Sequence, residues 1–138
     1  YINTITVTNR TGGVKMNREE MHDYMLSLPH TVCYYKEEWE AFLYKIEGKF
    51  YAMMADNQNA QAIISLKCNP ARAIELREQF PDDVKPGYYL NKTHWNSINI
   101  DNTLHESLLK ELMSHAHELI FNALPKKKQK ELNESLPI

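Results

Sequence analysis

Apolar residues recur at helical spacing in three stretches of the chain, near residues 17–28, 70–80 and 103–123. Each stretch opens on a residue that often caps helices: Asn17, Asn69 and Thr103. A proline follows each stretch within two residues, where a helix cannot continue. The pattern therefore predicts three helices, of which the last is the longest.

Between the first two predicted helices, apolar and polar residues alternate with the period of half-buried strands. Three strands are expected here, over residues 40–47, 50–55 and 61–67. Their connections are too short for a parallel crossover, so neighbouring strands should run antiparallel. Two further short strands are expected at Tyr88–Leu90 and Ser97–Ile100, and a tail follows the last helix. This order predicts an α+β fold, an antiparallel sheet with helices packed on one face.

A chain of 138 residues is long enough for one domain with a hydrophobic core. We expect residues 16–138 to form that single domain, and residues 1–15 to be an N-terminal extension or a short strand. Six large apolar side chains are expected to be mostly buried: Phe42, Ile64, Trp95, Leu108, Leu112 and Ile120.

The charge and the cysteine count argue against several classes of protein. The formal net charge of −2 lacks the basic balance of most nucleic-acid binders, so DNA binding would depend on a local cluster. Two cysteines, Cys33 and Cys68, are too few for a disulfide framework, but a single disulfide between them is an alternative. Their spacing is not that of a zinc site. No run approaches the roughly 18 apolar residues that span a bilayer, and no signal-peptide pattern is found. We expect a cytoplasmic protein with no membrane partner.

Sequence motifs of common enzymes are not found. The chain has no GxSxG, no phosphate-binding loop and no HExxH. Ser65 and Ser97 lie in expected strands without an obvious base. His115 and His117 are two residues apart on the last helix, so they point to different faces and cannot share a metal. These patterns predict a protein that is not an enzyme and holds no cofactor and no metal.

A distinctive run, Pro-Gly-Tyr-Tyr-Leu-Asn-Lys-Thr-His-Trp-Asn-Ser-Ile, covers residues 86–98. It is preceded by Leu66–Pro70 and Leu76–Pro81, and the last helix ends in Leu124–Lys127. Over residues 16–132 this arrangement resembles the MmcQ/YjbR family. The resemblance implies a twisted antiparallel sheet with helices packed on it, similar to the bacterial frataxin-like superfamily. It also implies DNA binding, because the family is commonly described as a DNA-binding domain.

Residues 86–97 and the second helix together offer hydrogen-bond donors, cations and one large aromatic ring. Such a set suits a phosphate backbone or a small anion, and the ring of Trp95 offers a stacking surface. The candidate nucleic-acid or anion site consists of Lys67, Arg72, Arg77, Asn91, Lys92, His94 and Asn96. We expect Lys92 and His94 beside a groove between this segment and the second helix.

A structural interpretation of the same residues is also open. Trp95 would be a core anchor, while Asn91 and Asn96 would satisfy backbone groups of the turn. The chain has Asn69 and Tyr89 where the family often has Asp and His, so no family role is carried over to those two positions.

Two charged clusters lie outside this segment. Lysines at 126–128 and 130 form the densest basic cluster, which suits either a helix C-terminus or a phosphate contact. An acidic edge beside Trp39, which we interpret as a solvated surface, consists of Glu37, Glu38 and Glu40.

The leading hypothesis is a non-enzymatic binding module that binds DNA. One alternative is a small-molecule or anion-binding protein that uses the 86–97 loop. Another is a protein-interaction domain that uses the exposed side of the sheet. Salt dependence distinguishes the first hypothesis from the others, because phosphate contacts release counterions and weaken steeply with salt.

Overall fold

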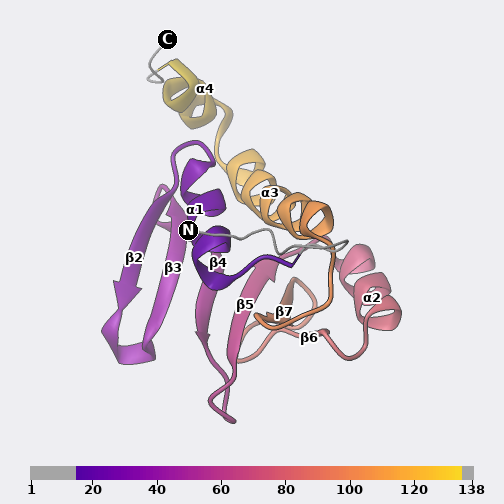
Figure 1. Cartoon of the computed structure of the whole chain (residues 1–138). Helices are drawn as coiled ribbons and strands as arrows, with labels where there is room; N and C mark the ends of the chain where they lie inside the picture. Colours follow the sequence, from indigo (N-terminus) through magenta and orange to yellow (C-terminus); the bar gives the residue numbers. More distant parts are fainter. Residues whose placement is uncertain (1–14, 135–138) are drawn as a thin grey trace.

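The computed structural model describes residues 15–134, which form one antiparallel sheet of six strands with the helices on one face (Figure 1). The strand order is β2-β3-β4-β5-β7-β6, and every neighbouring pair is antiparallel. The fold class predicted from the sequence is therefore confirmed. The extension or strand expected over residues 1–15 lies outside the described residues, apart from Lys15.

Eleven elements of secondary structure are present in the described part of the chain. The strands are β2 (Val32–Lys36), β3 (Ala41–Ile46), β4 (Lys49–Asp56), β5 (Ala62–Lys67), β6 (Val84–Pro86) and β7 (Trp95–Asn99). The helices are α1 (Arg18–Ser27), α2 (Pro70–Gln79), α3 (Glu106–Ala123), α4 (Lys126–Glu134) and the short 3-10 helix η1 (Glu37–Trp39). None of these helices is both long and apolar enough to cross a membrane.

The first two helices begin at the predicted caps. The Asn17 side chain accepts the Glu20 amide at 2.8 Å, and the Glu20 carboxylate accepts the Asn17 amide at 3.0 Å, which completes a capping box. The Asn69 side chain accepts the backbone amides at the start of α2, where Pro70 needs no partner. Both starts follow from local hydrogen bonding that the sequence already encodes.

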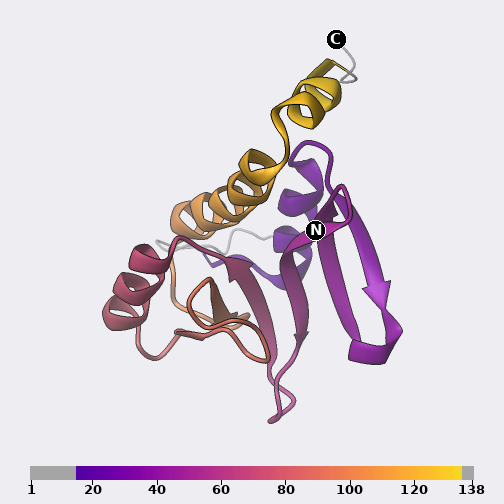
Figure 2. The same ribbon diagram turned by 180° about the vertical axis from the view of Figure 1, so that it is seen from behind.

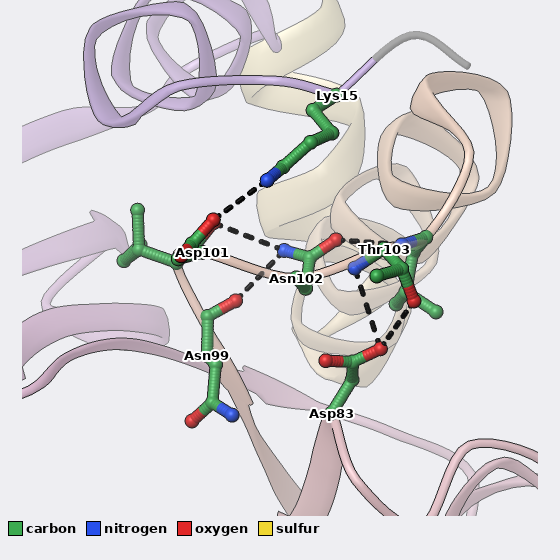
Figure 3. A network of polar contacts seen from close by, with 8 residues as sticks. Lys15, Asp83, Asn99, Asp101, Asn102 and Thr103 are labelled. Carbon is green, nitrogen blue, oxygen red and sulfur yellow. Dashed lines mark hydrogen bonds and ion pairs between the residues drawn. The ribbon is translucent and has the colours of Figure 1, made fainter. Parts of the chain in front are cut away.

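The predicted start of the third helix at Thr103 is wrong. The helix α3 begins at Glu106, and His105 is its cap, with Nδ1 accepting the Ser107 amide at 3.1 Å. Thr103 does not cap the helix because its hydroxyl donates to Asp83 Oδ2 at 2.7 Å (Figure 3). A tertiary partner therefore removes the hydroxyl that would have capped the helix.

A polar corner joins β7 to α3, as Figure 3 shows. Asn102 is 1% exposed, and its amide donates to the Asn99 carbonyl at 2.7 Å while its oxygen accepts the Leu104 amide at 2.8 Å. At the outer side of the corner, Lys15 Nζ lies 2.6 Å from Asp101 Oδ1. The buried amide of Asn102 thus has partners for both its nitrogen and its oxygen.

The hydrophobic core lies between the sheet and the helices α1 and α3, with α2 at the β6 end. Four of the expected core residues are buried: Ile64, Trp95, Leu112 and Ile120. Leu108 is half-buried at the border of the core. The prediction for Phe42 is wrong, because 43% of this residue is exposed. It lies near the start of β3, next to η1, and contacts Tyr35 instead, with 4.9 Å between ring centroids. The ends of β2 and β3 that η1 connects extend beyond the helices (Figure 1).

Strands β3, β4 and β5 are the predicted meander, and β7 matches the expected strand at Ser97–Ile100 within two residues. The strand expected at Tyr88–Leu90 is wrong, since β7 pairs instead with Val84–Pro86. Tyr89 has a φ of +57°, which breaks an extended chain. The edge strand β2 was not predicted.

The expected tail after α3 is helical and forms α4, which continues beyond the end of α3 (Figures 1 and 2). Pro125 ends α3 but supplies the carbonyl that accepts the Gln129 amide at 3.0 Å, so a second helix starts at once. The lysines of the basic cluster lie on α4, where Lys128 is 3.6 Å from Glu47 and 3.3 Å from Glu131.

Candidate functional site

The loop 87–94 between β6 and β7 is held close to the sheet by a glycine. The Gly87 amide donates to the Trp95 carbonyl at 2.9 Å. A Cβ atom at position 87 would lie only 2.7 Å from the Trp95 Cβ, a distance that real side chains do not adopt. Trp95 is 7% exposed and packs on Phe50, with 5.2 Å between ring centroids. The loop therefore begins at a tight contact that only glycine permits.

Three residues of the candidate nucleic-acid or anion site come together beneath this loop, and we name Arg77, Lys92 and Asn96 the loop clamp. The Arg77 guanidinium donates to Asn96 Oδ1 at 2.7 Å and to the backbone carbonyls of Lys92 and Trp95. The Lys92 ammonium donates to the Gly87 carbonyl at 2.7 Å. Asn96 is 2% exposed, and its amide donates to the Ala73 carbonyl at 3.2 Å. The loop clamp ties the loop to α2 and β7.

Asn91 also serves the loop itself. Its Oδ1 accepts the backbone amides of Thr93 at 2.9 Å and His94 at 3.0 Å, which is the geometry of an Asx turn. The structural interpretation thus matches the hydrogen bonds of Asn91, whereas Asn96 bonds to Arg77 and to the Ala73 carbonyl of α2 rather than to the turn. Their polar groups act within the protein.

The other three residues of the candidate site point in different directions. Arg72 forms a two-point contact with the Glu111 carboxylate, one bond of it 2.7 Å long. Lys67 pairs with Trp95 in the sheet and lies 5.8 Å over its ring, whereas the neighbouring pair, Leu66 and Asn96, faces the helices. His94 is exposed. The seven residues therefore do not form one continuous basic face.

The space between α2 and β7 is small. A cavity of about 10 Å³ lies there, lined by Leu66, Cys68, Asn96 and their neighbours. Neither Lys92 nor His94 lines it. A space of this size holds at most one water molecule.

The face of the sheet opposite α1 and α3 carries a larger hollow, which we name the open-face pocket. Its volume is about 460 Å³. The floor consists of Ala41, Met53 and Ala55 from β3 and β4. One wall is Glu38 and Trp39 of η1, and the other is Tyr88, Tyr89 and Leu90 of the loop. Asp56, the last residue of β4, also lines the pocket. This size lies within the usual range of ligand pockets, about 300–1,000 Å³.

Aromatic rings dominate the walls of the open-face pocket. The rings of Tyr88 and Tyr89 are 4.5 Å apart, and 86% of Tyr89 is exposed. Trp39 is 51% exposed and meets the edge of Phe50 at 6.3 Å. Desolvation, followed by the neighbouring hydroxyl of Tyr89, raises the pKa of Tyr88 above its usual value. The Tyr88 hydroxyl therefore stays protonated at neutral pH and can donate a hydrogen bond.

The charges of the open-face pocket are all negative. Glu38 and Asp56 line it, and none of its lining residues is basic. Asp56 is 3.6 Å from Arg18 on α1, and both side chains are more than half exposed. Glu38 belongs to the acidic edge that the sequence showed beside Trp39. Sequence reasoning noted this edge but missed the pocket, because nothing local indicates that Tyr88 and Tyr89 lie opposite.

Groups that could act as nucleophiles are held in structural contacts. Ser65 and Ser97 are both buried, their hydroxyls are 2.6 Å apart, and Ser97 Oγ also accepts the Tyr88 amide. Burial raises the pKa of the Cys33 thiol, which disfavours the reactive thiolate. Within residues 15–134, no three His, Cys, Asp or Glu side chains are grouped so that they could hold a metal ion. The absence of enzyme activity stays a prediction.

Comparisons with known proteins identify relatives of this chain. The family model described as YjbR matches residues 26–119. The uncharacterized protein YjbR of Escherichia coli K12 is 32% identical over 115 residues, which cover 83% of this chain and 96% of that protein. The uncharacterized protein YbdF of Escherichia coli O157:H7 is 29% identical over 119 residues, with the same coverage.

Solved structures agree with this relationship. A crystal structure of a Deinococcus radiodurans protein with the domain DUF419 has a TM-score of 0.78 and 30% identity, and the match covers 88% of this chain and 89% of that one. A Pseudomonas syringae protein shares the fold, with a TM-score of 0.66, 22% identity, and coverage of 75% and 98%. Since both the family model and the Escherichia coli relative span most of its length, this chain belongs to the YjbR family.

Proposed function

We propose that this protein is a non-enzymatic binding module that holds a small organic molecule in the open-face pocket. The observation that supports this is the pocket itself, a hollow of about 460 Å³ with an apolar floor and aromatic walls. Pockets of this composition, with a few polar groups that fix orientation, are typical of small-molecule sites. The proposal agrees with the alternative in which the 86–97 loop binds a small molecule.

The construction of the loop supports the same function. A binding wall must be rigid, since a loop that reorders on binding loses affinity to conformational entropy. Gly87, the loop clamp and the Asn91 turn fix the inner side of the loop. Its outer side then presents Tyr88, Tyr89 and Leu90 to the pocket. The polar residues that the sequence singled out would serve binding indirectly, as supports of the wall.

A fragment screen by NMR tests the proposal. With ¹⁵N-labelled protein, a library of small neutral, cationic and anionic fragments should include members that shift the Trp39 indole and the amides of 88–90. Trp39→Ala should abolish these shifts, whereas Tyr35→Ala should preserve them. The two aromatic residues are similarly exposed, at 51% and 47%, but Tyr35 does not line the pocket. If no fragment shifts the pocket signals, the proposed function is wrong.

DNA binding stays a prediction, and the observed contacts give it little support. Arg72 and the loop clamp already donate to protein acceptors, so phosphates would compete with existing hydrogen bonds. A titration with duplex and single-stranded DNA at several salt concentrations tests it. Lys92→Ala should weaken binding equally across sequences and lower the salt slope by about one unit. No binding by the wild type at low salt would exclude this function.

A further inference from the structure

We propose that the open-face pocket selects organic cations, namely an ammonium or guanidinium group on a small apolar body. This inference rests on the proposed function and adds the chemical class of the ligand. It combines three properties of the pocket: the sign of its charge, the nature of its walls and the shape of its floor.

The charge of the pocket favours a cation. Glu38 and Asp56 are the ionisable carboxylates of its lining, and no Lys, Arg or His joins them there. Asp56 has a partner in Arg18, but at 3.6 Å and in a solvated position, so this contact is weak. Among residues 15–134, Glu38 has no ion pair. The two carboxylates would repel an anion, whereas a cation could pair with Glu38.

The walls of the pocket favour the same class. Faces of Trp and Tyr rings attract cations through their quadrupole, and three such rings line the pocket: Trp39, Tyr88 and Tyr89. The ring of Trp39 already accepts one cation, since Lys36 Nζ lies 4.8 Å from its centroid. Lys36 does not line the pocket. Clusters of aromatic rings are the groups that proteins use to bind quaternary ammonium ligands.

The floor indicates a free small molecule as the source of the cation. Ala41 and Met53 are buried, and Ala55 is half-buried, so the floor is apolar and lies below the walls. A volume of about 460 Å³ exceeds what one lysine or arginine side chain fills, and the apolar floor would cover the body of a small amine. We therefore assign the site to an organic amine rather than to a peptide side chain.

The test compares two probes of the same shape: choline, and dimethylbutanol, its uncharged isostere in which carbon replaces nitrogen. Both are titrated into the ¹⁵N-labelled protein while the Trp39 indole signal is followed. Choline should bind at least about fivefold more tightly than its isostere, the size of one cation–π contact or one solvated ion pair. Choline binding should also weaken as sodium chloride is added.

Glu38→Gln provides the matched variant, because it removes the charge and keeps the shape. It should weaken choline binding about threefold or more and leave dimethylbutanol binding unchanged. Glu37→Gln is the control, since Glu37 is the adjacent exposed carboxylate and does not line the pocket. Thermal unfolding of both variants checks that they are folded.

The outcomes separate this inference from the proposed function. If the isostere binds as tightly as choline, or if neutral or anionic fragments shift the pocket signals and choline does not, the cation inference is wrong and the pocket remains a binding site. If neither probe nor any fragment shifts the signals of Trp39 and residues 88–90, both proposals are wrong. If free choline fails but a lysine-rich peptide shifts the same signals, the occupant is a protein and the small-amine assignment is wrong.

Discussion

The two sides of the loop 87–94 have opposite characters. Its inner side is rich in charge and hydrogen-bond donors, yet Arg77, Lys92 and Asn96 all donate to protein acceptors. Its outer side has few polar groups, yet its rings border a hollow that the protein leaves open. The comparison teaches that a cluster of polar residues in a sequence indicates where hydrogen bonds are made, but not whether the partner is a ligand or the chain itself. We therefore base the proposed site on open surface rather than on polar composition.

The largest loss of stability is expected for a substitution of Arg77, because this residue holds the loop against β7. Arg77→Ala removes the donor to Asn96 Oδ1 and to two carbonyls, and so leaves a buried amide oxygen unpaired. We expect a loss of roughly 3 kcal/mol of unfolding free energy. Chemical denaturation measures this loss. Arg72→Ala is the control, because its exposed ion pair with Glu111 should contribute about 1 kcal/mol or less. Equal losses in the two variants would mean that the loop clamp has no special role.

Gly87→Ala should have the next largest effect and lower the unfolding free energy by about 2 kcal/mol. The added methyl would meet the Trp95 Cβ at 2.7 Å and the Leu90 Cβ at 3.2 Å, so the loop must shift. Because the loop also forms the pocket wall, binding of NMR fragments should fall in the same variant. Gly48→Ala is a contrasting substitution, since its Cβ would meet no atom within 4 Å, and its cost comes from a φ of +81° alone. Unchanged fragment binding in Gly87→Ala would mean that the inner side of the loop does not determine the position of the pocket wall.

A smaller change in stability is expected at the outer side. Trp39→Ala removes a side chain that is 51% exposed, so the unfolding free energy should fall by only about 1 kcal/mol or less. Fragment binding, in contrast, should be lost. Thermal unfolding and NMR titration together should thus distinguish Trp39 from the clamp residue Arg77, whose substitution should lower the stability more. A large loss of stability in Trp39→Ala would show that this ring is a core residue and not a binding wall.

The smallest effect concerns pH. His115 Nε2 accepts the Asn69 amide at 3.2 Å, at the start of α2. Desolvation lowers the pKa of His115 below the usual 6.5. The unfolded chain therefore binds the proton more readily, so stability should decrease as the pH falls from 7 to 5. His115→Gln keeps an acceptor that does not titrate and should lack this decrease. Thermal unfolding at both pH values compares the two proteins. An identical pH response would assign the decrease to other groups.

Local signals in the sequence were sufficient for much of the fold. The caps at Asn17 and Asn69 act through atoms within three residues, and so they were predictable. Thr103 was not, because its hydroxyl bonds to Asp83, 20 residues earlier in the chain. Phe42 alternates correctly for a core position, but whether a helix covers that end of the sheet is a property of the assembled layers.

The candidate site shows the same limit more strongly. The residues of the 86–97 loop were recognised as unusual, and the loop does border the open-face pocket. Its partners on the opposite wall, Glu38 and Trp39, are about 50 residues away in sequence and were interpreted separately. They line the same pocket although β3, β4 and β5 lie between β2 and β7 in the sheet order. A pocket of this kind depends on register and topology, which composition does not encode.

The two edge strands have a consequence for self-association. In the described part of the chain, β6 is three residues long and ends at Pro86, which has no N–H to offer a further strand. The other edge, β2, is five residues long and carries exposed Val32, Tyr34 and Tyr35. A fibre needs two complementary edges on every copy, whereas a sheet with one open edge can pair only once. We therefore expect any strand-to-strand association of the described sheet through β2 to close at two copies.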